Sequence, residues 1–530
     1  MNSDPSEATP TDRRGHRQLL LRGGLVADGV GTRTRRADIL IDGPLIRWIG
    51  LGDPGVGDHD TLTLNPGTVL CPGFIDAHIH AETCLLTDGR VDAALSQGVT
   101  TLVVGQDGMS WIGAERRTID YLNRYFAAVN GPIPSDHAMS VAEFARHVSD
   151  RLSQNVAVLA SHGTIRYNVG GVDPGRLSRR QQAAARSQVE NCLADGAVGM
   201  SSGFDYLPSA YGDVDEMTDL AHPLSEAGRP YVSHMRGNGP GARAGLTELI
   251  RVGRNAAVRV HASHLWGSPD DIVAAYQAAD EGGVYLSHDM YPYRRSSTAL
   301  AALLLPKPFQ AGGPDATVAR LREPALRAEL RSAPTMRTEV LDSVVLGYVP
   351  PAYADDVGLS ITAAAARCRR APQDWVMDLI VDANMVVGGH RERPALTDEH
   401  LRWIVDHERY AAGSDGIFLG QLPHPRGSGT FPRLARHYLS QGPERGYQLL
   451  ARHAAANPAA TYGLGRRGRL VPGLAADIVV IGPGGLHERA TYGHPDRPAD
   501  GVDLVLVNGT VVWRSGKVLE GRHPGSVISN

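Results

Sequence analysis

The chain has 530 residues, with 53 Lys or Arg, 57 Asp or Glu and a formal net charge of −4. This balance, without a long basic run, argues against a nucleic acid or another polyanion as partner. No apolar stretch reaches the roughly 18 residues that a membrane-spanning helix needs, so no membrane partner is expected. The four cysteines are scattered and form no Cys-x-x-Cys pair. Such usage is typical of a reducing compartment and predicts a cytoplasmic protein.

The two ends of the chain differ in texture from its middle. Residues 1–18 are polar and have no apolar core, which predicts a disordered tail rather than a signal peptide. Residues 19–70 read as short β-rich runs separated by Gly-containing turns, and residues 460–530 read alike. We therefore expect both terminal segments to meet in one small β-sandwich domain.

Residues 71–459 have the pattern of an α/β domain. Short apolar runs alternate with Ala-rich helical stretches such as "SPDDIVAAYQAADEGG", which indicates βα units and a parallel sheet. The eight candidate strands are 74–80, 100–107, 157–166, 197–204, 231–236, 259–265, 284–293 and 410–416. Eight such strands predict a (β/α)8 TIM barrel. The long segment 303–409, rich in Pro and Arg, is predicted as an insertion that covers the active site.

Polar residues stand at the ends of most candidate strands, where barrels build active sites. His78 and His80 are two positions apart in "FIDAHIH", so their side chains point to the same side of the strand. The other strand-end candidates are Asp107, His162, His234, His264 and Asp415. A lone histidine is more often a core or surface residue. Several imidazoles with two carboxylates at equivalent positions instead predict a site for zinc or a similar divalent ion.

An ordered series of motifs runs through the chain. They are "PGFIDAHIH", "GVTTLVVGQDG", "SHGTIR", "GAVGMSSGFDYLPSAY", "YVSHMRG", "ASHL", "YPYRRSSTAL", "GSDG", "HPRGSGTF", "LAADIVVIGP" and "VNGTVVWRSGKVLEGRHPG". Their order and spacing resemble the N-acyl-D-amino-acid deacylase (D-aminoacylase) family of the amidohydrolase superfamily. The resemblance covers nearly the whole chain beyond residue 20. It implies a metal-dependent hydrolase of linear amides that converts an N-acyl-D-amino acid and water into a carboxylate and a D-amino acid.

The resemblance also implies one or two zinc ions per chain. The implied ligands are His78, His80 and Asp415 for one ion, and His234 and His264 for the other. Where the family has a cysteine in "GNCG", this chain has "GQDG", with Asp107 at the cysteine position. We expect Asp107 to be a ligand, because a carboxylate can bridge two cations, although it is a harder donor than a thiolate. Two alternatives stay open: Asp107 as a helix N-cap, and Cys84 as a substitute thiolate rather than a small packed residue.

The implied mechanism rests on the metal and on one carboxylate. Zinc makes hydroxide available near neutral pH and polarises the scissile carbonyl. Asp415 is expected to take the proton of the attacking water and then to deliver it to the leaving amine, as general base and then general acid. The alternative role for Asp415 is that of a capping residue or of a residue that supports the ligands.

The residues expected to bind the substrate depart from the family in one place. The family binds the substrate carboxylate with a Lys in "SHLK", the first Tyr of "YPY" and the Arg of "HPR". This chain keeps Tyr291 and Arg426, and an arginine is suited to bidentate binding of a carboxylate. It has Trp266 at the Lys position, so either Arg294 or Arg295 provides the missing charge or the substrate differs. Trp266 can stack on a bulky group or simply pack, and the arginine pair can simply be solvated.

Four further residues have weaker assignments. Tyr206 matches a family position near the substrate, and its alternative is a core tyrosine with a satisfied hydroxyl. Ser297 is a weak candidate for another polar contact with the substrate. His162 and His288 stand outside the family's ligand set, and we interpret both as residues that support the ligands or the core.

Two other functions remain open from the sequence. The same site can act on a cyclic amide, an imide or another N-acylated amine, which the Trp266 and Asp107 departures would favour. A barrel protein that binds metal without catalysis is the other, and the retained Asp415 and four ligand histidines argue against it. In either enzyme the partner is a small-molecule substrate. The sequence is compatible with a homo-oligomer and does not define the number of subunits.

Overall fold

The computed structural model describes residues 18–55 and 57–529, which form a mixed α/β structure. Residues 1–17 of the predicted tail lie outside the described residues, and its last residue, Gln18, begins strand β1 (Gln18–Val26). Within the described ranges, no helix combines the length and the apolar character that crossing a lipid bilayer would require.

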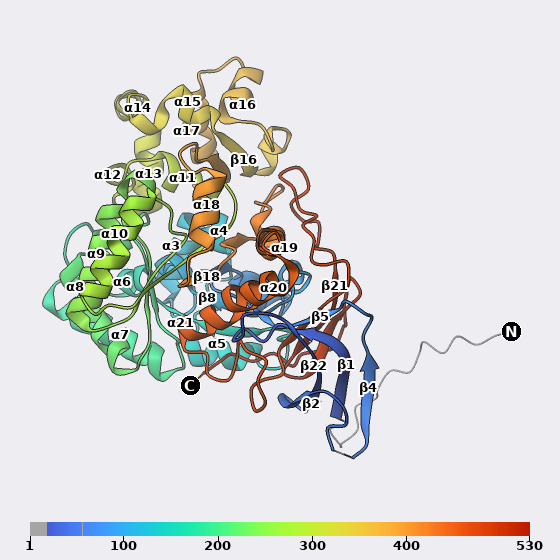
Figure 1. The fold of residues 1–530 in the computed structure, drawn as a ribbon. Coiled ribbons are helices and arrows are strands. Elements are labelled where there is room, and N and C mark those ends of the chain that lie inside the picture. The colour runs from blue at the N-terminus through green and yellow to red at the C-terminus, as the bar shows by residue number, and fades with distance from the viewer. Residues whose placement is uncertain (1–17, 56, 530) are drawn as a thin grey trace.

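One nine-stranded sheet contains strands from both ends of the chain (Figure 1). Besides β1 it comprises β2 (Arg35–Asp42), β3 (Leu45–Gly50), β4 (His59–Thr63), β5 (Val69–Pro72), β20 (Ile478–Ile481), β21 (Val502–Val507), β22 (Thr510–Arg514) and β23 (Lys517–Val518). The order is β23-β22-β21-β20-β5-β1-β2-β3, with β4 beside β1, and antiparallel pairing of β5 with β20 joins the two halves. Leu21, Ile39 and Ile478 share one buried cluster, so apolar burial stabilises the junction of the two ends.

A second set of strands pairs in parallel through the middle of the chain. It comprises β6 (Phe74–Asp76), β7 (Ile79–His80), β8 (Val99–Val104), β9 (Asn155–Val158), β10 (Ala160–Ser161), β11 (Met200–Gly203), β12 (Tyr231–His234), β13 (Val260–Ala262), β14 (Leu286–Met290), β18 (Tyr410–Ala412) and β19 (Gly416–Ile417). The pairs follow chain order in three groups: β6-β8-β9, β10-β11-β12-β13-β14-β18, and β19-β7. Each predicted strand segment of residues 71–459 therefore contains at least one observed strand.

Helices alternate with these strands. They are α1 (Glu82–Thr87), α2 (Asp92–Leu95), α3 (Arg116–Tyr125), α4 (Ala127–Asn130), α5 (Val141–Val148), α6 (His162–Gly170), α7 (Arg179–Ala194), α8 (Val214–Glu226), α9 (Ala242–Ala256), α10 (Pro269–Glu281), α19 (Arg426–Leu439), α20 (Pro443–Ala451) and α21 (Asn457–Tyr462). Local sequence explains several of their starts. The Ser268 hydroxyl accepts a hydrogen bond from the Asp271 amide and Pro269 follows, which is the usual chemistry at the start of a helix.

Two predicted strands end earlier than the sequence pattern indicated. Residues 162–166 lie in helix α6 instead of a strand, and residues 106–107 lie in the 3-10 turn η1 (Gln106–Gly108). Glycine residues allow the backbone to make both turns close to neighbouring segments of the chain. A Cβ atom at Gly105 would lie 2.5 Å from the Leu159 carbonyl oxygen, and Gly105 also has a φ of +82°. The strand pattern continues into both turns in the sequence, so the pattern alone does not show where the backbone leaves the sheet.

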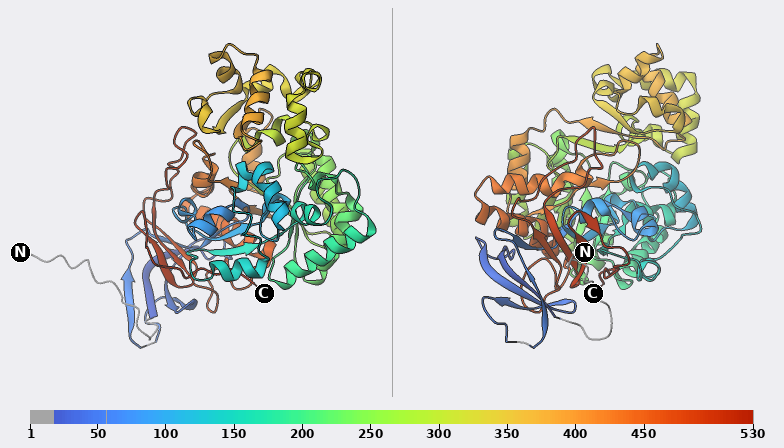
Figure 2. Two further views of the ribbon diagram at one scale, coloured as in Figure 1. Left: turned by 180° about the vertical axis from the view of Figure 1, so that it is seen from behind. Right: turned by 90° about the vertical axis from the view of Figure 1, so that its right-hand side faces the viewer.

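The chain between β14 and β18 forms a separate cluster of elements at the end of the molecule away from the nine-stranded sheet (Figures 1 and 2). Its strands are β15 (Arg295–Ala299), β16 (Val344–Tyr348) and β17 (Gly388–Glu392), in the order β15-β17-β16. Its helices are α11 (Leu300–Leu304), α12 (Lys307–Gln310), α13 (Gly313–Arg322), α14 (Pro324–Arg331), α15 (Thr338–Asp342), α16 (Ile361–Arg367) and α17 (Pro372–Asp382). Helix α18 (Asp398–Val405) ends this segment and packs against β14 and β18. Antiparallel pairing of β15 with β17 sets Arg295 opposite Glu392 and brings the far side of this segment back to residues 291–299.

Candidate metal centre

Four histidines surround one carboxylate at the ends of the parallel strands. The distances from Asp107 oxygens to ring nitrogens are 3.5 Å for His78, 3.8 Å for His80, 3.4 Å for His234 and 3.5 Å for His264. Oδ1 of Asp107 faces His78 and His264, while Oδ2 faces His80 and His234. Asp107 is 3% exposed, so this carboxylate is shared by four imidazoles in a site almost closed to solvent.

Backbone geometry sets the direction of several of these side chains. Asp107, His264 and Asp415 have φ values of +57°, +34° and +50°, in a region that residues other than glycine seldom adopt. Strained backbone of this kind persists where the surrounding structure holds it and is frequent at functional sites. Three of the six predicted ligands are therefore presented by turns that begin as a parallel strand ends.

Asp415 lies at the edge of the same cluster. Its Oδ1 is 3.7 Å from Nε2 of His78 and 3.3 Å from Nε2 of His80, and its Oδ2 is 2.6 Å from Nη1 of Arg426. Burial favours the neutral acid, but the Arg426 guanidinium and the neighbouring histidines outweigh it and lower the pKa of Asp415. Asp415 is therefore a carboxylate at neutral pH, which both a metal ligand and a general base require.

The ring nitrogens that face away from the cluster have partners of their own. These partners are Asp289 for His78 (3.4 Å), Asn130 for His80 (2.7 Å) and Asp205 for His234 (3.0 Å). Such bonds define the orientation and the tautomer of a ligating imidazole. The sequence analysis did not assign a role to these three residues. Asp289 lies inside the predicted strand 284–293 but one residue before the observed end of β14, so a correctly placed strand end would have found it.

The donor set fits a divalent metal ion. His78, His80 and Asp415 bring their donor atoms within 4.8 Å of one another, and so do His78, Asp107 and His264. Nε2 of His78 and Oδ1 of Asp107 are buried without a hydrogen-bond partner, as is Nδ1 of His234. Buried polar atoms are rarely left unpaired, so these three atoms indicate a shared partner between them. Imidazole and carboxylate are ligands that zinc accepts.

The electrostatic field at the centre also favours a cation. Burial lowers the pKa of an imidazole, but the carboxylates of Asp289, Asp107 and Asp415 more than compensate and raise the pKa of His78 to about 9. These carboxylates converge where the histidine rings meet. A dipositive ion placed there would be stabilised by the same field.

The residues predicted to bind substrate carboxylate lie next to Asp415. Arg426 is fully buried, and its Nη2 donates a hydrogen bond to the Ser297 carbonyl oxygen at 3.3 Å. The Arg426 guanidinium carbon lies 4.5 Å from the centre of the Tyr291 ring. The Tyr206 ring packs 5.1 Å from that of His234, and the Tyr206 hydroxyl is 3.2 Å from the hydroxyl of Thr298. The structure thus brings Tyr206, Tyr291 and Arg426 to one side of the metal centre.

Arg294 and Arg295 have a carboxylate partner of their own. Both pair with Glu392, at 3.4 Å and 2.8 Å respectively, and both side chains are partly exposed. Trp266 lies against Gly239, where a Cβ atom would come within 2.4 Å of the indole ring. The guanidinium carbon of Arg393 lies 5.4 Å from the centre of the Trp266 ring, and the sequence analysis did not identify this residue. Arg393 has no motif around it, so only the strand pairing of the insertion reveals its place.

Three residues weighed in the sequence analysis lie outside the cluster. Both ring nitrogens of His162 are bonded, to Ser209 at 2.7 Å and to Glu216 at 2.8 Å. His288 is bonded to the Tyr276 hydroxyl and the Ile404 carbonyl, and burial lowers its pKa to about 3. Burial and nearby acidic groups raise the pKa of the Cys84 thiol to about 11, and Cys84 is in neither group of potential metal donors found among the described residues.

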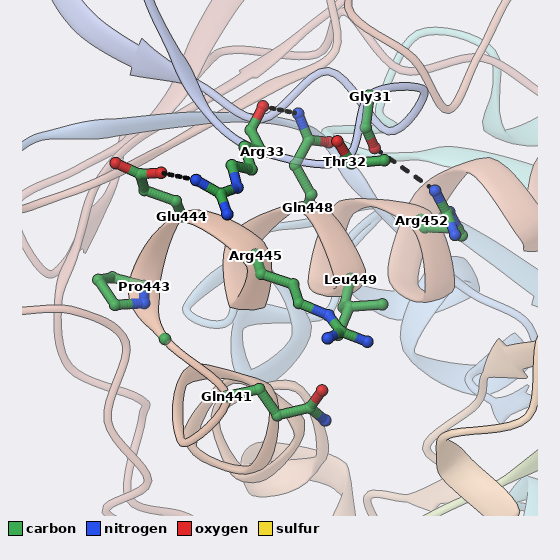
Figure 3. A pocket seen from close by; sticks show the side chains of 11 residues that line it. Gly31, Thr32, Arg33, Gln441, Pro443, Glu444, Arg445, Gln448, Leu449 and Arg452 are labelled. Atoms are coloured by element: carbon green, nitrogen blue, oxygen red, sulfur yellow. Dashed lines mark hydrogen bonds and ion pairs between the residues drawn. The ribbon is translucent and has the colours of Figure 1, made fainter.

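A cavity of about 740 Å³ lies between the loop at Gly31–Arg33 and helix α20 (Figure 3). Gln448 and Arg452 of the helix region bond to carbonyl oxygens of this loop. None of the predicted ligands or substrate-binding residues lines this cavity. The chemistry of the molecule is therefore concentrated at the buried cluster and not in this open groove.

Known proteins are similar to this chain in sequence and in fold. Residues 66–513 match the Amidohydrolase family. The chain is 28% identical to the N-acyl-D-glutamate deacylase of Alcaligenes xylosoxydans xylosoxydans, over 94% of this chain and 96% of that protein. It is 29% identical to the D-aminoacylase of the same organism, over 96% of this chain and 97% of that protein.

A solved structure is similar over almost the same length. It is an N-acyl-D-glutamate deacylase from Bordetella bronchiseptica complexed with zinc and a phosphonate inhibitor, with a TM-score of 0.79, 27% identity, and coverage of 97% of this chain and 99% of that chain. These similarities confirm the resemblance that the motifs indicated. The matched segment spans most of the chain and every candidate ligand from His78 to Asp415, so this chain belongs to the amidohydrolase family.

Proposed function

We propose that this chain is a zinc-dependent hydrolase of linear amides that converts an N-acyl-D-amino acid and water into a carboxylate and a D-amino acid. The observation that supports this most directly is the Asp107 carboxylate within 3.8 Å of four histidines, with Asp415 beside them. The similar proteins whose names describe deacylation of N-acyl-D-amino acids match this chain from end to end, which supports the substrate class.

We further propose the architecture that the sequence predicted. The parallel pairs β6-β8-β9, β10 to β18 and β19-β7 support a (β/α)8 barrel, because β7 follows β6 and β19 follows β18 after short gaps. The mixed terminal sheet supports a small β-sandwich domain from residues 19–70 and 460–530. Residues 71–459 are then the catalytic domain, with the insertion at about 303–409.

Asp107 is proposed as the ligand that replaces the family cysteine. Each of its oxygens faces one histidine of each implied ligand pair, so the Asp107 carboxylate lies between the two pairs and within reach of both. A carboxylate is a harder donor than a thiolate, so this centre should tolerate other divalent ions better than a cysteine-containing centre would. One or two zinc ions fit the donor set.

A zinc ion held by the four histidines and Asp107 would lower the pKa of a bound water and polarise a carbonyl oxygen. Asp415 then takes the proton of the attacking water and passes it to the nitrogen of the leaving amine. Because Arg426 holds the pKa of Asp415 low, the carboxylate is ionised before the reaction begins. Arg426 and Tyr291 bind the substrate carboxylate, while Tyr206 and Ser297 line the same side.

The cyclic-amide alternative and the non-catalytic alternative make different predictions for the products. We favour the linear amide because the similar proteins named above carry the names of deacylases and match this chain over nearly their full length. The four cysteines form no disulfide, which supports a cytoplasmic location. The arrangement of subunits does not enter the proposal.

The test is release of primary amine by zinc-loaded protein from a panel of N-acyl-D-amino acids with acidic, aliphatic and aromatic side chains. The L-isomers are one control, and a 5-substituted hydantoin, which is a cyclic amide, is the other. We expect amine from D-substrates and none from the hydantoin. Ring opening without amine release would support the cyclic-amide function, and silence from protein shown to contain metal would reject both hydrolase proposals.

A further inference from the structure

Arg393 is a buried arginine without a carboxylate partner. The residue comes directly after β17 in the chain and is 8% exposed. Nη2 donates a hydrogen bond to the Tyr293 carbonyl oxygen at 2.9 Å, and Nε donates one to the Arg294 carbonyl oxygen at 3.1 Å. Among the described residues, no Asp or Glu forms an ion pair with Arg393. All of its hydrogen-bond partners are neutral peptide groups.

A buried charge of this kind is costly to leave without a counter-ion. Burial of an ionised group is unfavourable by several kcal/mol unless an opposite charge compensates for it. Peptide carbonyls orient the guanidinium but carry no net charge. Arg426 is 0% exposed and has such a partner in Asp415 at 2.6 Å. Arg393 therefore has an unmet requirement for an anion that Arg426 does not have.

The two arginines lie over one tyrosine. The guanidinium carbons of Arg393 and Arg426 are 5.2 Å and 4.5 Å from the centre of the Tyr291 ring. Burial lowers the pKa of Arg393 and so does the charge of Arg426, so the two guanidinium groups repel each other, and an anion shared between them would relieve that repulsion. The Tyr291 hydroxyl has no hydrogen-bond partner among the described residues. Two cations and a free hydroxyl next to Asp415 are a suitable set of donors for one carboxylate.

Trp266 holds Arg393 in place from the other side. The Arg393 guanidinium lies 5.4 Å from the Trp266 ring, within the range of a cation–π contact. The indole ring is in turn packed on Gly239, which has no side chain to displace it. Trp266 occupies the position at which the family motif has its lysine. This chain thus has an aromatic surface where the motif has a cation, and a cation from the insertion lies on that surface.

We propose that Arg393 binds the α-carboxylate of the substrate together with Arg426 and Tyr291, in place of the lysine that Trp266 replaces. The proposal rests on the proposed function for the identity of the substrate. It also assigns different roles to the arginines of the insertion. Arg294 and Arg295 pair with Glu392 nearer the surface, and Arg393 makes the buried contact with the substrate.

The test uses Arg393→Met, which keeps the length of the side chain and removes its charge, and Arg393→Lys, which keeps the charge. Arg402→Met is the matched control, because Arg402 is an exposed arginine of α18 in the same segment. Thermal unfolding of all three variants shows whether they remain folded. The substrates are the best N-acetyl-D-amino acid for the wild type and its neutral carboxamide analogue.

Arg393→Met should raise KM for the acid by about 10- to 100-fold, the effect of losing a hydrogen bond to a charged group, with kcat much less affected. Turnover of the carboxamide, which lacks the negative charge, should change less than about threefold. Arg393→Lys should recover part of the loss, and Arg402→Met should match the wild type. An unchanged KM for the acid in Arg393→Met, or an equal loss on acid and carboxamide, would overturn the proposal.

Calorimetric titration separates this proposal from the proposed function. The N-acetyl-D-amino acid and its carboxamide are titrated into wild type and Arg393→Met under conditions without turnover. Tighter binding of the acid by the wild type, lost in Arg393→Met, supports the carboxylate site even if zinc-loaded protein never releases amine. Equal binding by the two proteins, or no binding by either, overturns it whatever the outcome of the amine assay.

Discussion

The metal centre and the carboxylate side of the site, which comprises Tyr291, Arg426, Trp266 and Arg393, are assembled in opposite ways. Candidate ligands of the metal centre come from the ends of parallel strands and from the turns after them, in motifs of a few residues such as "HIH" and "GSD". The carboxylate side joins groups from distant parts of the chain, including one residue of the insertion that no motif marks. A centre built on strand ends can be recognised locally, whereas a pocket closed by an insertion depends on long-range pairing.

Among the changes that test this comparison, removal of the metal is expected to have the largest effect on activity and stability. Dialysis against a chelator should reduce amide hydrolysis to background and lower the midpoint temperature of unfolding, because ion binding stabilises only the folded arrangement of the ligands. Added zinc should restore both quantities. Turnover by protein that elemental analysis shows to be free of metal would contradict the proposal that the metal centre catalyses the reaction.

The substitution Asp415→Asn is expected to have the next largest effect. It should lower kcat by about 10²- to 10⁴-fold or more, because the amide can neither take nor return the proton. Most of the metal should stay bound, since the four histidines and Asp107 are unchanged. Asp173→Asn, at an exposed position, is the matched control for the same chemical change. Retained turnover in Asp415→Asn would rule out the proton-transfer role, and measurement of kcat together with metal content checks both expectations.

Asp107 tests whether the centre depends on the carboxylate that replaces the family cysteine. Asp107→Ala should weaken zinc binding by at least about 100-fold, more than the loss of a residue that only supports a ligand. Asp107→Cys should retain zinc and lose affinity for harder ions such as Mn²⁺. Competition titration with a metal indicator measures both. If Asp107→Ala binds as much metal as the wild type, Asp107 is not a ligand; it is not a helix N-cap either, because it lies inside η1, whose N-cap is Gly105.

The smallest effect is expected at the partly exposed arginine pair. Arg294→Ala should change KM for the N-acyl-D-amino acid by less than about threefold, because a surface ion pair contributes only about 0.2–1 kcal/mol. Steady-state kinetics of this variant beside Arg393→Met show directly which arginine serves the substrate. A large rise in KM for Arg294→Ala would show instead that Arg294 provides the positive charge that Trp266 leaves missing.

Several parts of the site could be predicted because their signals are local. Alternation in "FIDAHIH" placed His78 and His80 on one side, and both face Asp107 even though residues 77–78 separate β6 from β7. His234 ends β12 and His264 follows β13, so strand order was enough to bring them near the first two histidines. Strand ends were harder to place. His162 follows a strand in the sequence but begins helix α6 and bonds to Ser209 and Glu216, so it points away from the ligands.

The partners of the ligands carried little local signal. Asn130 ends the short helix α4 and bonds to His80, and Asp205 lies in a loop and bonds to His234. Their roles depend on contacts between residues 29 to 50 positions apart. Hydropathy patterns describe which face of an element is buried and do not specify which polar groups will meet across such a separation.

The sequence by itself determined the family, the alternation of strands and helices, and the candidate ligand side chains, because each is encoded in short runs of residues. Only the tertiary structure decided that the Asp107 oxygens divide four histidines between them, that Glu392 pairs with both Arg294 and Arg295, and that Arg393 lies on Trp266. The physical reason is that charge pairing and burial act through space. They bring together groups whose separation along the chain has no periodicity to reveal it.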